Sequence, residues 1–396
     1  MSGIATTVIA DAQGLEALEE TWNHLLGESP DGDSIYLTYE WVATWWAHFG
    51  QGRHLHVLVF HKHSRVVGIV PLIKAEYRLG PLRWCTLETI GALFCNHIGL
   101  ALRGSSEDVA AATLSYINGE LGKNVSALRL RLVPEDCLFL GQMRRHVASS
   151  RTLIIHETLM TVAPYIQLPS TRDGYFSSLS RNMRRNLRRS QTALRSAGSV
   201  EIGRCTEEDL ESYLVKFFDL HQRQWQSIGG RRWFNDARTR AFYRDVARRF
   251  ASKGWLYFSY MLINKDFAHA KLGFIYGGKF SAVAIARDQR YSYYRLGHVH
   301  TMHSIGYAID SRLQEFDLSR YGAVHKFQWT KSARQCLEIL VVRRSILRGL
   351  HLKLIHVLVR LHEVRENGIR TSYRLRMAKK RQERLKRKMG LSMWPE

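Results

Sequence analysis

The chain has 396 residues, 45% of them hydrophobic, a length that favours two domains of ordinary size, each with its own core. Its formal net charge of +23 and pI near 10.1 imply an acidic partner, such as nucleic acid, anionic lipid or a phosphorylated substrate. The five cysteines are scattered without a CxxC pair, which argues against a disulfide framework or a zinc site and fits a reducing cytoplasm.

The N-terminus carries an aspartate and glutamates where an export signal needs a basic start and an apolar run. No apolar stretch approaches the roughly 20 residues that a membrane-spanning helix requires. We therefore expect a cytoplasmic protein that is soluble or peripheral to the inner face of the membrane.

Residues 1–165 have the pattern of a first α/β unit. Helical spacing predicts helices over 14–26 and 38–50, and an alternating apolar pattern over 55–78 predicts a β-hairpin. A strand at 85–91 and a further helix and strand follow. The aromatic residues of the second helix are predicted to be core: Trp41, Trp45, Trp46 and Phe49.

Residues 178–198 form a predicted basic amphipathic helix that ends at Gly198. Arginines recur along it mostly at steps of three and four residues: Arg181, Arg184, Arg185, Arg188, Arg189 and Arg195. They form either a solvated face or a surface that contacts phosphate. Two more helices are expected within 207–226 and 236–254. The segment between these two helices, with Gly229 and Gly230, is expected to be a mobile loop on the substrate side.

An antiparallel meander is predicted over residues 255–286, where three segments rich in aromatic and β-branched residues are separated by short turns. Gly297 then precedes a helical pattern over 298–313, and the segment 316–329 closes the unit. A strand that leads through a glycine loop into a helix N-terminus is a potential anion site, because the first helical amides lack acceptors.

This order of elements resembles the acyl-CoA-binding core of GNAT-type N-acyltransferases. The run is most similar to the BioF-like, CelD-type acetyltransferase family, which is related to the Fem aminoacyl ligases. The matching pieces are LHQRQW (220–225), KLGFIYGG, ARD (286–288), YYRLGHV (293–299), FDLSR and HK (325–326).

The resemblance implies an α/β (α+β) fold with two tandem GNAT-like domains and mixed, mostly antiparallel sheets. Residues 1–165 would be a degenerate N-terminal copy and residues 166–345 the acyltransferase domain. Residues 346–396 form a basic tail with fourteen Lys and Arg against four Glu, beginning with a helical stripe of leucines. The tail is a solubilising end, an anchor on anionic lipid, or an arm that binds RNA such as tRNA.

Acyl transfer to an amine needs a site for the donor's pyrophosphate, a group that polarises the thioester, and a base. By resemblance, the loop before the helix would bind the cofactor; its residues are Arg295, Gly297, His298 and Val299. Leu296 stands where the family usually has proline. Tyr294 would donate a proton to the leaving thiolate.

The closing segment supplies the other catalytic candidates. Asp317 and Lys326 keep the family spacing, whereas His325 replaces the family's tyrosine. Lys326 would stabilise an oxyanion or contact a phosphate, or else pair with Asp317, and His325 would be the base. The substrate-side candidates lie in the LHQRQW segment: His221, Arg223 and Trp225.

The histidines at 298, 300 and 303 form no complete ligand set, so no metal site is predicted. The expected function is therefore transfer of an acetyl or other acyl group from acyl-CoA to an amine of a sugar, amino acid or envelope or exopolysaccharide precursor. Two rivals stay open: a Fem-like transferase that uses aminoacyl-tRNA, and an inactive binding or scaffold protein in polysaccharide synthesis.

Overall fold

The computed structural model describes residues 3–29, 34–79, 81–99, 107–226 and 233–344. The predicted loop around Gly229 and the tail 346–396 with its leucine stripe lie outside these ranges. Within them, none of the helices is long and apolar enough to cross a membrane.

Within the described residues, the first half of the chain contains six strands and five α-helices. They are β1 (Ile4–Ile9), α1 (Ala12–Glu16), α2 (Glu19–Gly27), η1 (Ile35–Leu37), α3 (Tyr39–Phe49), β2 (His54–Lys62), β3 (Arg65–Leu79), β4 (Leu82–Thr89), η2 (Ala92–Phe94), α4 (Glu107–Glu120), β5 (Ala127–Pro134), α5 (Leu138–Ser149) and β6 (Leu153–Gln167).

The second half follows with α6 (Arg172–Ser178), α7 (Arg181–Arg195), β7 (Val200–Arg204), α8 (Leu210–Gln226), η3 (Trp233–Asn235), α9 (Ala237–Ser252), β8 (Leu256–Ile263), β9 (Asp266–Tyr276), β10 (Lys279–Arg287), η4 (Gln289–Tyr294), α10 (Leu296–Asp310), β11 (Glu315–Asp317), η5 (Lys326–Gln328) and β12 (Ala333–Arg343). The predicted hairpin is β2–β3 and the predicted meander is β8–β10, so both predictions are confirmed.

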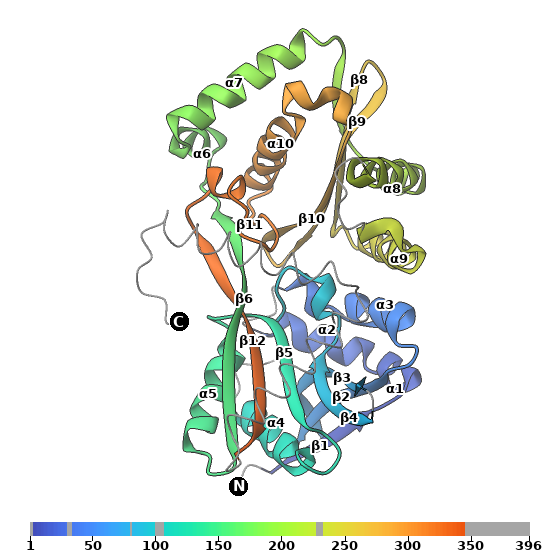
Figure 1. The fold of residues 1–396 in the computed structure, drawn as a ribbon, viewed down its shortest axis with the longest axis vertical. Coiled ribbons are helices and arrows are strands. Elements are labelled where there is room, and N and C mark those ends of the chain that lie inside the picture. The colour runs from blue at the N-terminus through green and yellow to red at the C-terminus, as the bar shows by residue number, and fades with distance from the viewer. Residues whose placement is uncertain (1–2, 30–33, 80, 100–106, 227–232, 345–396) are drawn as a thin grey trace.

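All the strands join one sheet in the order β1-β2-β3-β4-β5-β12-β6-β11-β10-β9-β8-β7. The long strand β6 connects the two halves, because it pairs with β12 along most of its length and with β11 at its end (Figure 1). The last strand, β12, returns to the first half and lies between β5 and β6.

The two halves repeat one order of elements: a strand, helices, an antiparallel three-strand meander, a helix, and a strand parallel to the end of the meander. The parallel pair is β4–β5 in the first half and β10–β11 in the second. The predicted α/β class with a mostly antiparallel sheet is therefore confirmed.

An aromatic core joins the halves between α3 and α9. Trp41 is fully buried and its ring contacts Phe242, Phe250 and Phe274 of the second half at centroid distances of 5.1, 6.5 and 6.1 Å. Trp45 and Phe49 are buried as well, and Trp46 is partly buried against the same cluster. The prediction that this helix supplies core residues is confirmed.

The predicted basic helix is α7. The hydroxyl of Ser180 caps its start by accepting a hydrogen bond from the amide of Met183. Four residues on one side are buried: Met183, Leu187, Ser190 and Leu194. The helix packs against α10 and η4 with this side, and all of its arginines except the partly buried Arg184 are exposed. Figure 1 shows α7 next to α10.

Candidate active site

The site lies where β10 and β11 separate. The two strands pair in parallel over only three residues, from Lys279 to Ser281, and β10 then continues to Arg287 paired with β9 on its other side. A bulge between Ala282 and Ala284 bends β10 at this point. The described part of β10 beyond Ser281 thus has no strand on its β11 side, and its backbone groups between Ala282 and Arg287 are not paired with a strand there.

Two side chains reach this free edge of β10 from other elements. The amide nitrogen of Asn96 donates to the carbonyl of Ala282 at 2.9 Å, and the side-chain oxygen of Gln224 accepts from the amide of Arg287 at 2.9 Å. Asn96 belongs to the first half and Gln224 to α8. The edge is therefore bounded at its two ends, with Ile285 exposed between them.

The N-terminus of α10 opens beside the end of β10, after the short helix η4. Arg295 precedes it with φ 52°, a left-handed conformation that is uncommon for a residue other than glycine. No side chain caps the helix. Its first amides and the positive end of its dipole therefore suit an anion. Gly297 was expected before the helix but is its second residue.

Three predicted site residues lie near the N-terminus of α10: His298, His325 and Lys326. Nε2 of His298 lies 3.4 Å from the side-chain oxygen of Gln328, the last residue of η5. His325 is half-buried; burial lowers its pKa, as do the positive charges of Lys326, His298 and Arg287. The imidazole of His325 is thus favoured in its neutral, basic form.

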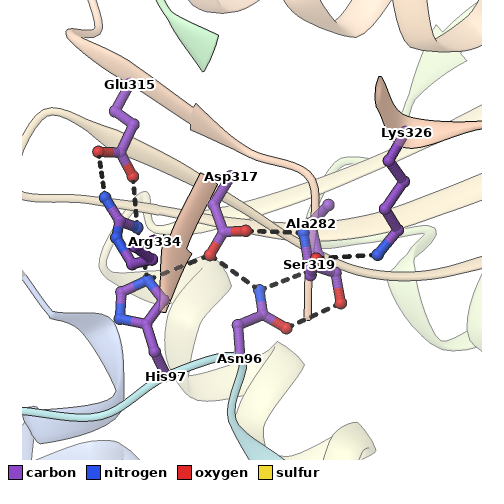
Figure 2. A network of polar contacts seen from close by, with 8 residues as sticks. All are labelled: Asn96, His97, Ala282, Glu315, Asp317, Ser319, Lys326 and Arg334. Atoms are coloured by element: carbon purple, nitrogen blue, oxygen red, sulfur yellow. Dashed lines mark hydrogen bonds and ion pairs between the residues drawn. The ribbon is translucent and has the colours of Figure 1, made fainter. Parts of the chain in front are cut away.

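Asp317, at the end of β11, is the centre of a buried network between the two halves (Figure 2). It is 1% exposed, accepts a hydrogen bond from the amide of Ser319 at 2.7 Å, and has Asn96 and His97 of the first half at 3.3 and 3.2 Å. Burial acts to raise the pKa of Asp317, but the contact with His97 and the charge of Arg334 outweigh it and lower the pKa. The carboxylate is therefore held ionised in place.

Arg334 of β12 extends this network. It donates to both carboxylate oxygens of Glu315, at 2.9 and 2.6 Å, and approaches Nε2 of His97 at 2.9 Å (Figure 2). A bidentate pair of this kind fixes both side chains. The returning strand β12 thus orients the residues at the base of the site.

Lys326 holds the loop that follows β11. Its Nζ atom donates to the carbonyls of Ser319 and Arg320 at 2.8 and 2.7 Å. Ser319 and Tyr321 have positive φ, at 69° and 72°. Burial lowers the pKa of Lys326 to about 8, against the opposing charge of Asp317. The lysine therefore stabilises a strained loop beside the site. Its charge also acts on His325, whose pKa it lowers.

The predicted substrate-side residues all lie on α8. His221 is buried in an aromatic cluster beside Trp225 and Phe234, and burial lowers its pKa to about 4. Trp225 has a buried indole nitrogen without a described partner. Arg223 is exposed on α8, near enough to Asp288 for its charge to act on that carboxylate.

Tyr294 and Val299 face the α7 side of α10. Tyr294 is partly buried against an apolar cluster that includes Leu194. Val299 lines a cavity of about 310 Å³ between α6, α7 and α10. A larger cavity, of about 790 Å³, lies in the first half around Tyr77 and Trp84.

Sequence reasoning missed two groups of polar residues. Asn96 and His97 gave no local signal, because their partner Asp317 is more than two hundred residues away along the chain. His269 and Lys271 did give one, as polar residues at alternate positions of an otherwise apolar strand, which places both on the buried face under α10. His300, one of the three histidines considered above as metal ligands, contacts His269. The described residues contain no group of three or more His, Cys, Asp and Glu that would hold a metal.

Residues 181–327 match the family model described as Acetyltransferase (GNAT) domain. The matched segment contains β7–β11, α7–α10 and the part of the site from Gln224 to Lys326, whereas Asn96, His97 and Arg334 lie outside it. A comparison with curated proteins finds no match.

Solved structures with a similar fold include FemX, with a TM-score of 0.58, 11% identity, and coverage of 85% of this chain and 96% of that chain. A conserved protein of unknown function from Bacteroides thetaiotaomicron has a TM-score of 0.54, 11% identity and coverage of 85% and 100%. L-PGS from Bacillus licheniformis has a TM-score of 0.51, 9% identity and coverage of 87% and 96%. At such low identity these likenesses show the fold alone, and they extend over both halves.

Proposed function

We propose that the second half is an N-acyltransferase that takes an acetyl or other acyl group from acyl-CoA and transfers it to an amine. The observation that carries this proposal is the free edge of β10 beside the uncapped N-terminus of α10. CoA has a diphosphate that suits helical amides and an arm with two amide groups that can pair with a free strand edge.

The predicted site residues would have different roles in this acyl transfer. The amides of α10 and the cation Arg295 would bind the diphosphate, with His298 and Val299 in the same turn. The amine nitrogen would attack the thioester carbon, and the C–S bond would break. His325 would take the proton from the amine, and Tyr294 would give one to the leaving thiolate. Asp317 and Lys326 would position the loop that carries His325.

The acceptor would approach from α8, which carries His221, Arg223 and Trp225. We propose an amine on a sugar, an amino acid or an envelope or exopolysaccharide precursor, as the resemblance to the BioF-like, CelD-type family implies. The protein would work in the cytoplasm, at the inner face of the membrane if its basic tail binds anionic lipid. We also propose the division into 1–165, 166–345 and 346–396, with β12 of the second range completing the sheet of the first.

Calorimetry with CoA tests donor binding, and release of free CoA thiol from acetyl-CoA in a screen of amines tests transfer. We expect CoA to bind the wild type, and His325→Ala to retain CoA while losing transfer by roughly 10²–10⁴-fold, the usual contribution of a general base. His156→Ala, an exposed histidine of β6, is the matched control. A wild type that does not bind CoA would refute the proposed donor.

A second candidate is transfer from aminoacyl-tRNA, which the relation to Fem ligases implies. The outward arginines of α7, a helix that packs against both α10 and η4, support it by placing positive charge next to the same opening. Stabilisation by aminoacyl-tRNA but not by acyl-CoA in a thermal-shift assay would favour this donor, and stabilisation by neither would favour the scaffold alternative.

A further inference from the structure

A chain of three polar side chains lies beneath the first turns of α10. Nδ1 of His269 on β9 is 2.8 Å from Nδ1 of His300 on α10, and Nε2 of His300 is 2.6 Å from the hydroxyl of Ser259 on β8. All three residues are 0% exposed. The last atom of this hydrogen-bonded series is Nε2 of His269, which is buried and has no hydrogen-bond partner. A buried polar atom without a partner is uncommon in a folded protein and calls for an explanation.

The hydrogen bonds between these three side chains can be donated in either of two directions. In the first, His269 donates to His300 and His300 donates to Ser259, which leaves Nε2 of His269 as a bare acceptor. In the second, Ser259 donates to His300 and His300 donates to His269, which leaves Nε2 of His269 as an N–H donor. Both arrangements are neutral and differ only in where the protons lie. An acceptor placed at Nε2 would therefore select the second.

Nε2 of His269 is directed at the N-terminal end of α10. A Cβ atom added to Gly297, the second residue of this helix, would lie 3.6 Å from Nε2. Since the Cα–Cβ bonds of an α-helix tilt toward its N-terminus, the space left by the missing side chain lies on the side where an anion would bind. A ligand oxygen in that space needs a shift of only about 0.7 Å to reach hydrogen-bond distance from Nε2.

The charged and titratable groups around His269 come from each packed element. Lys271 lies on the same strand, Arg287 is opposite on β10, and His300 and His303 lie on α10. Burial lowers the pKa of His269 to about 3, with smaller effects of the charges of Lys271 and Arg287. The imidazole is therefore neutral throughout the neutral pH range, and any hydrogen bond that it gives is that of a neutral donor.

We propose that His269 is a buried contact of the donor's diphosphate, in which its Nε2–H donates to a phosphate oxygen held at the N-terminus of α10. Binding of the donor fixes the direction of the hydrogen bonds, so that Ser259 donates to His300 and His300 donates to His269. This proposal rests on the proposed function, because it assumes a donor with a diphosphate at α10.

Nitrogen NMR of the histidines in the full-length wild type tests the tautomer directly. We expect the Nε2 resonance of His269 to become pyrrole-like, the signature of a protonated ring nitrogen, when CoA is added. Pantetheine, which has no diphosphate, should leave it unchanged. A resonance that stays pyridine-like in the CoA complex overturns the proposal.

Two amide variants, each with an N–H near one of the two ring-nitrogen positions, separate contact from packing. Glutamine places an amide N–H near the position of Nε2, whereas asparagine places one near Nδ1 and leaves the ε position empty. We expect His269→Asn to weaken CoA binding by about tenfold or more, the loss of a hydrogen bond to a charged group, and His269→Gln to lose much less. Neither variant should alter pantetheine binding. Equal CoA affinity in the wild type and in His269→Asn overturns the proposal.

Gly297→Ala tests the opening without removing the histidine. Its Cβ would make only ordinary van der Waals contact, so the fold should be retained, but it would fill the space between Nε2 and the ligand. We expect about tenfold weaker CoA binding, whereas Gly141→Ala in α5, with no atom within 4 Å of the added Cβ, should bind as the wild type does. A wild type that fails to bind CoA refutes the donor and this contact together. A wild type that binds CoA, with unchanged affinity in His269→Asn and Gly297→Ala, refutes the contact alone.

Discussion

Removing the carboxylate of Asp317 should destabilise the junction of the two halves. The side chain is 1% exposed and is held by the amide of Ser319 and by Asn96 and His97 of the first half. Taking one partner from a buried ionic network costs about 3–5 kcal/mol, because the groups left behind stay buried without compensation. For a urea slope of about 3 kcal/mol/M, Asp317→Ala should lower the midpoint of urea unfolding by about 1 M, and a steeper slope, which a longer chain can have, would make this shift smaller.

A double-mutant cycle with Asn96→Ala tests whether this loss belongs to the contact between the halves. We expect a coupling energy of about 0.5–3 kcal/mol between the two substitutions, since the side chains touch. Asp310→Ala is the matched control, because it removes an aspartate that pairs with Arg172 at the surface and should leave the midpoint nearly unchanged. Additive effects of the two substitutions, or a midpoint of Asp317→Ala equal to that of the control, would refute the role given to the network.

Trp41→Ala should cost about 3–5 kcal/mol in urea unfolding, because a fully buried indole is lost, and the partly buried Trp46→Ala should cost less; equal costs would contradict the placement of the core. Replacing Arg184, Arg185, Arg188 and Arg189 by Gln should flatten the salt dependence of polyuridylate binding by up to about four counterions, whereas an unchanged slope would show a solvated face. Burial lowers the pKa of Lys271 to about 7, below its value of about 10.4 in an unfolded chain, so the unfolded state holds the extra proton between these pH values and wild-type stability should rise with pH across that window. Lys271→Met should lose this rise in pH-dependent urea unfolding, and a rise that persists would exclude Lys271 as its source.

The local elements could be predicted because their signals are local. The alternation along 255–286 and the arginine and leucine spacing along 178–198 each depend on neighbours within a few residues, and β8–β10 and α7 follow them. The loop before α10 was predicted in the right place, but the helix begins at Leu296, two residues earlier than predicted. Arg295 has the positive φ, whereas Gly297 lies within the helix.

The base of the site could not be predicted in the same way. β12 lies between β5 and β6, and Asn96 and His97 reach Asp317 across more than two hundred residues. Nothing in the local pattern of these segments specifies a partner that far along the chain, because strand pairing over such distances depends on the packing of the whole domain. The candidate catalytic and donor-binding residues could therefore be named from the sequence of the second half. The contacts that hold them in place, such as those of Asn96 and His97 with Asp317, are visible only in the fold.

The repeated order of elements raises the question of why the second half, and not the first, would bind the donor. The helix after the meander is α4 in the first half and α10 in the second. The first turn of α4 carries Glu107 and Asp108, whereas that of α10 carries no acidic residue. Two carboxylates at a helix N-terminus already satisfy its positive end and repel a phosphate.

The parallel strands differ in the same sense. Glu88 of β4 is 3% exposed at its side chain, and Arg131 of β5 donates to it at 2.7 Å, with Arg129 at 3.7 Å. Both parallel pairs span three residues, but β4 ends at Thr89 and ion pairs tie its end to β5, whereas β10 continues past Ser281 to Arg287 with no strand on its β11 side. Within the described residues, each half thus keeps the shared arrangement of strands, and the second combines a free strand edge with a helix N-terminus open to an anion. This difference supports one donor site per chain, with the first half acting as the support that supplies Asn96 and His97.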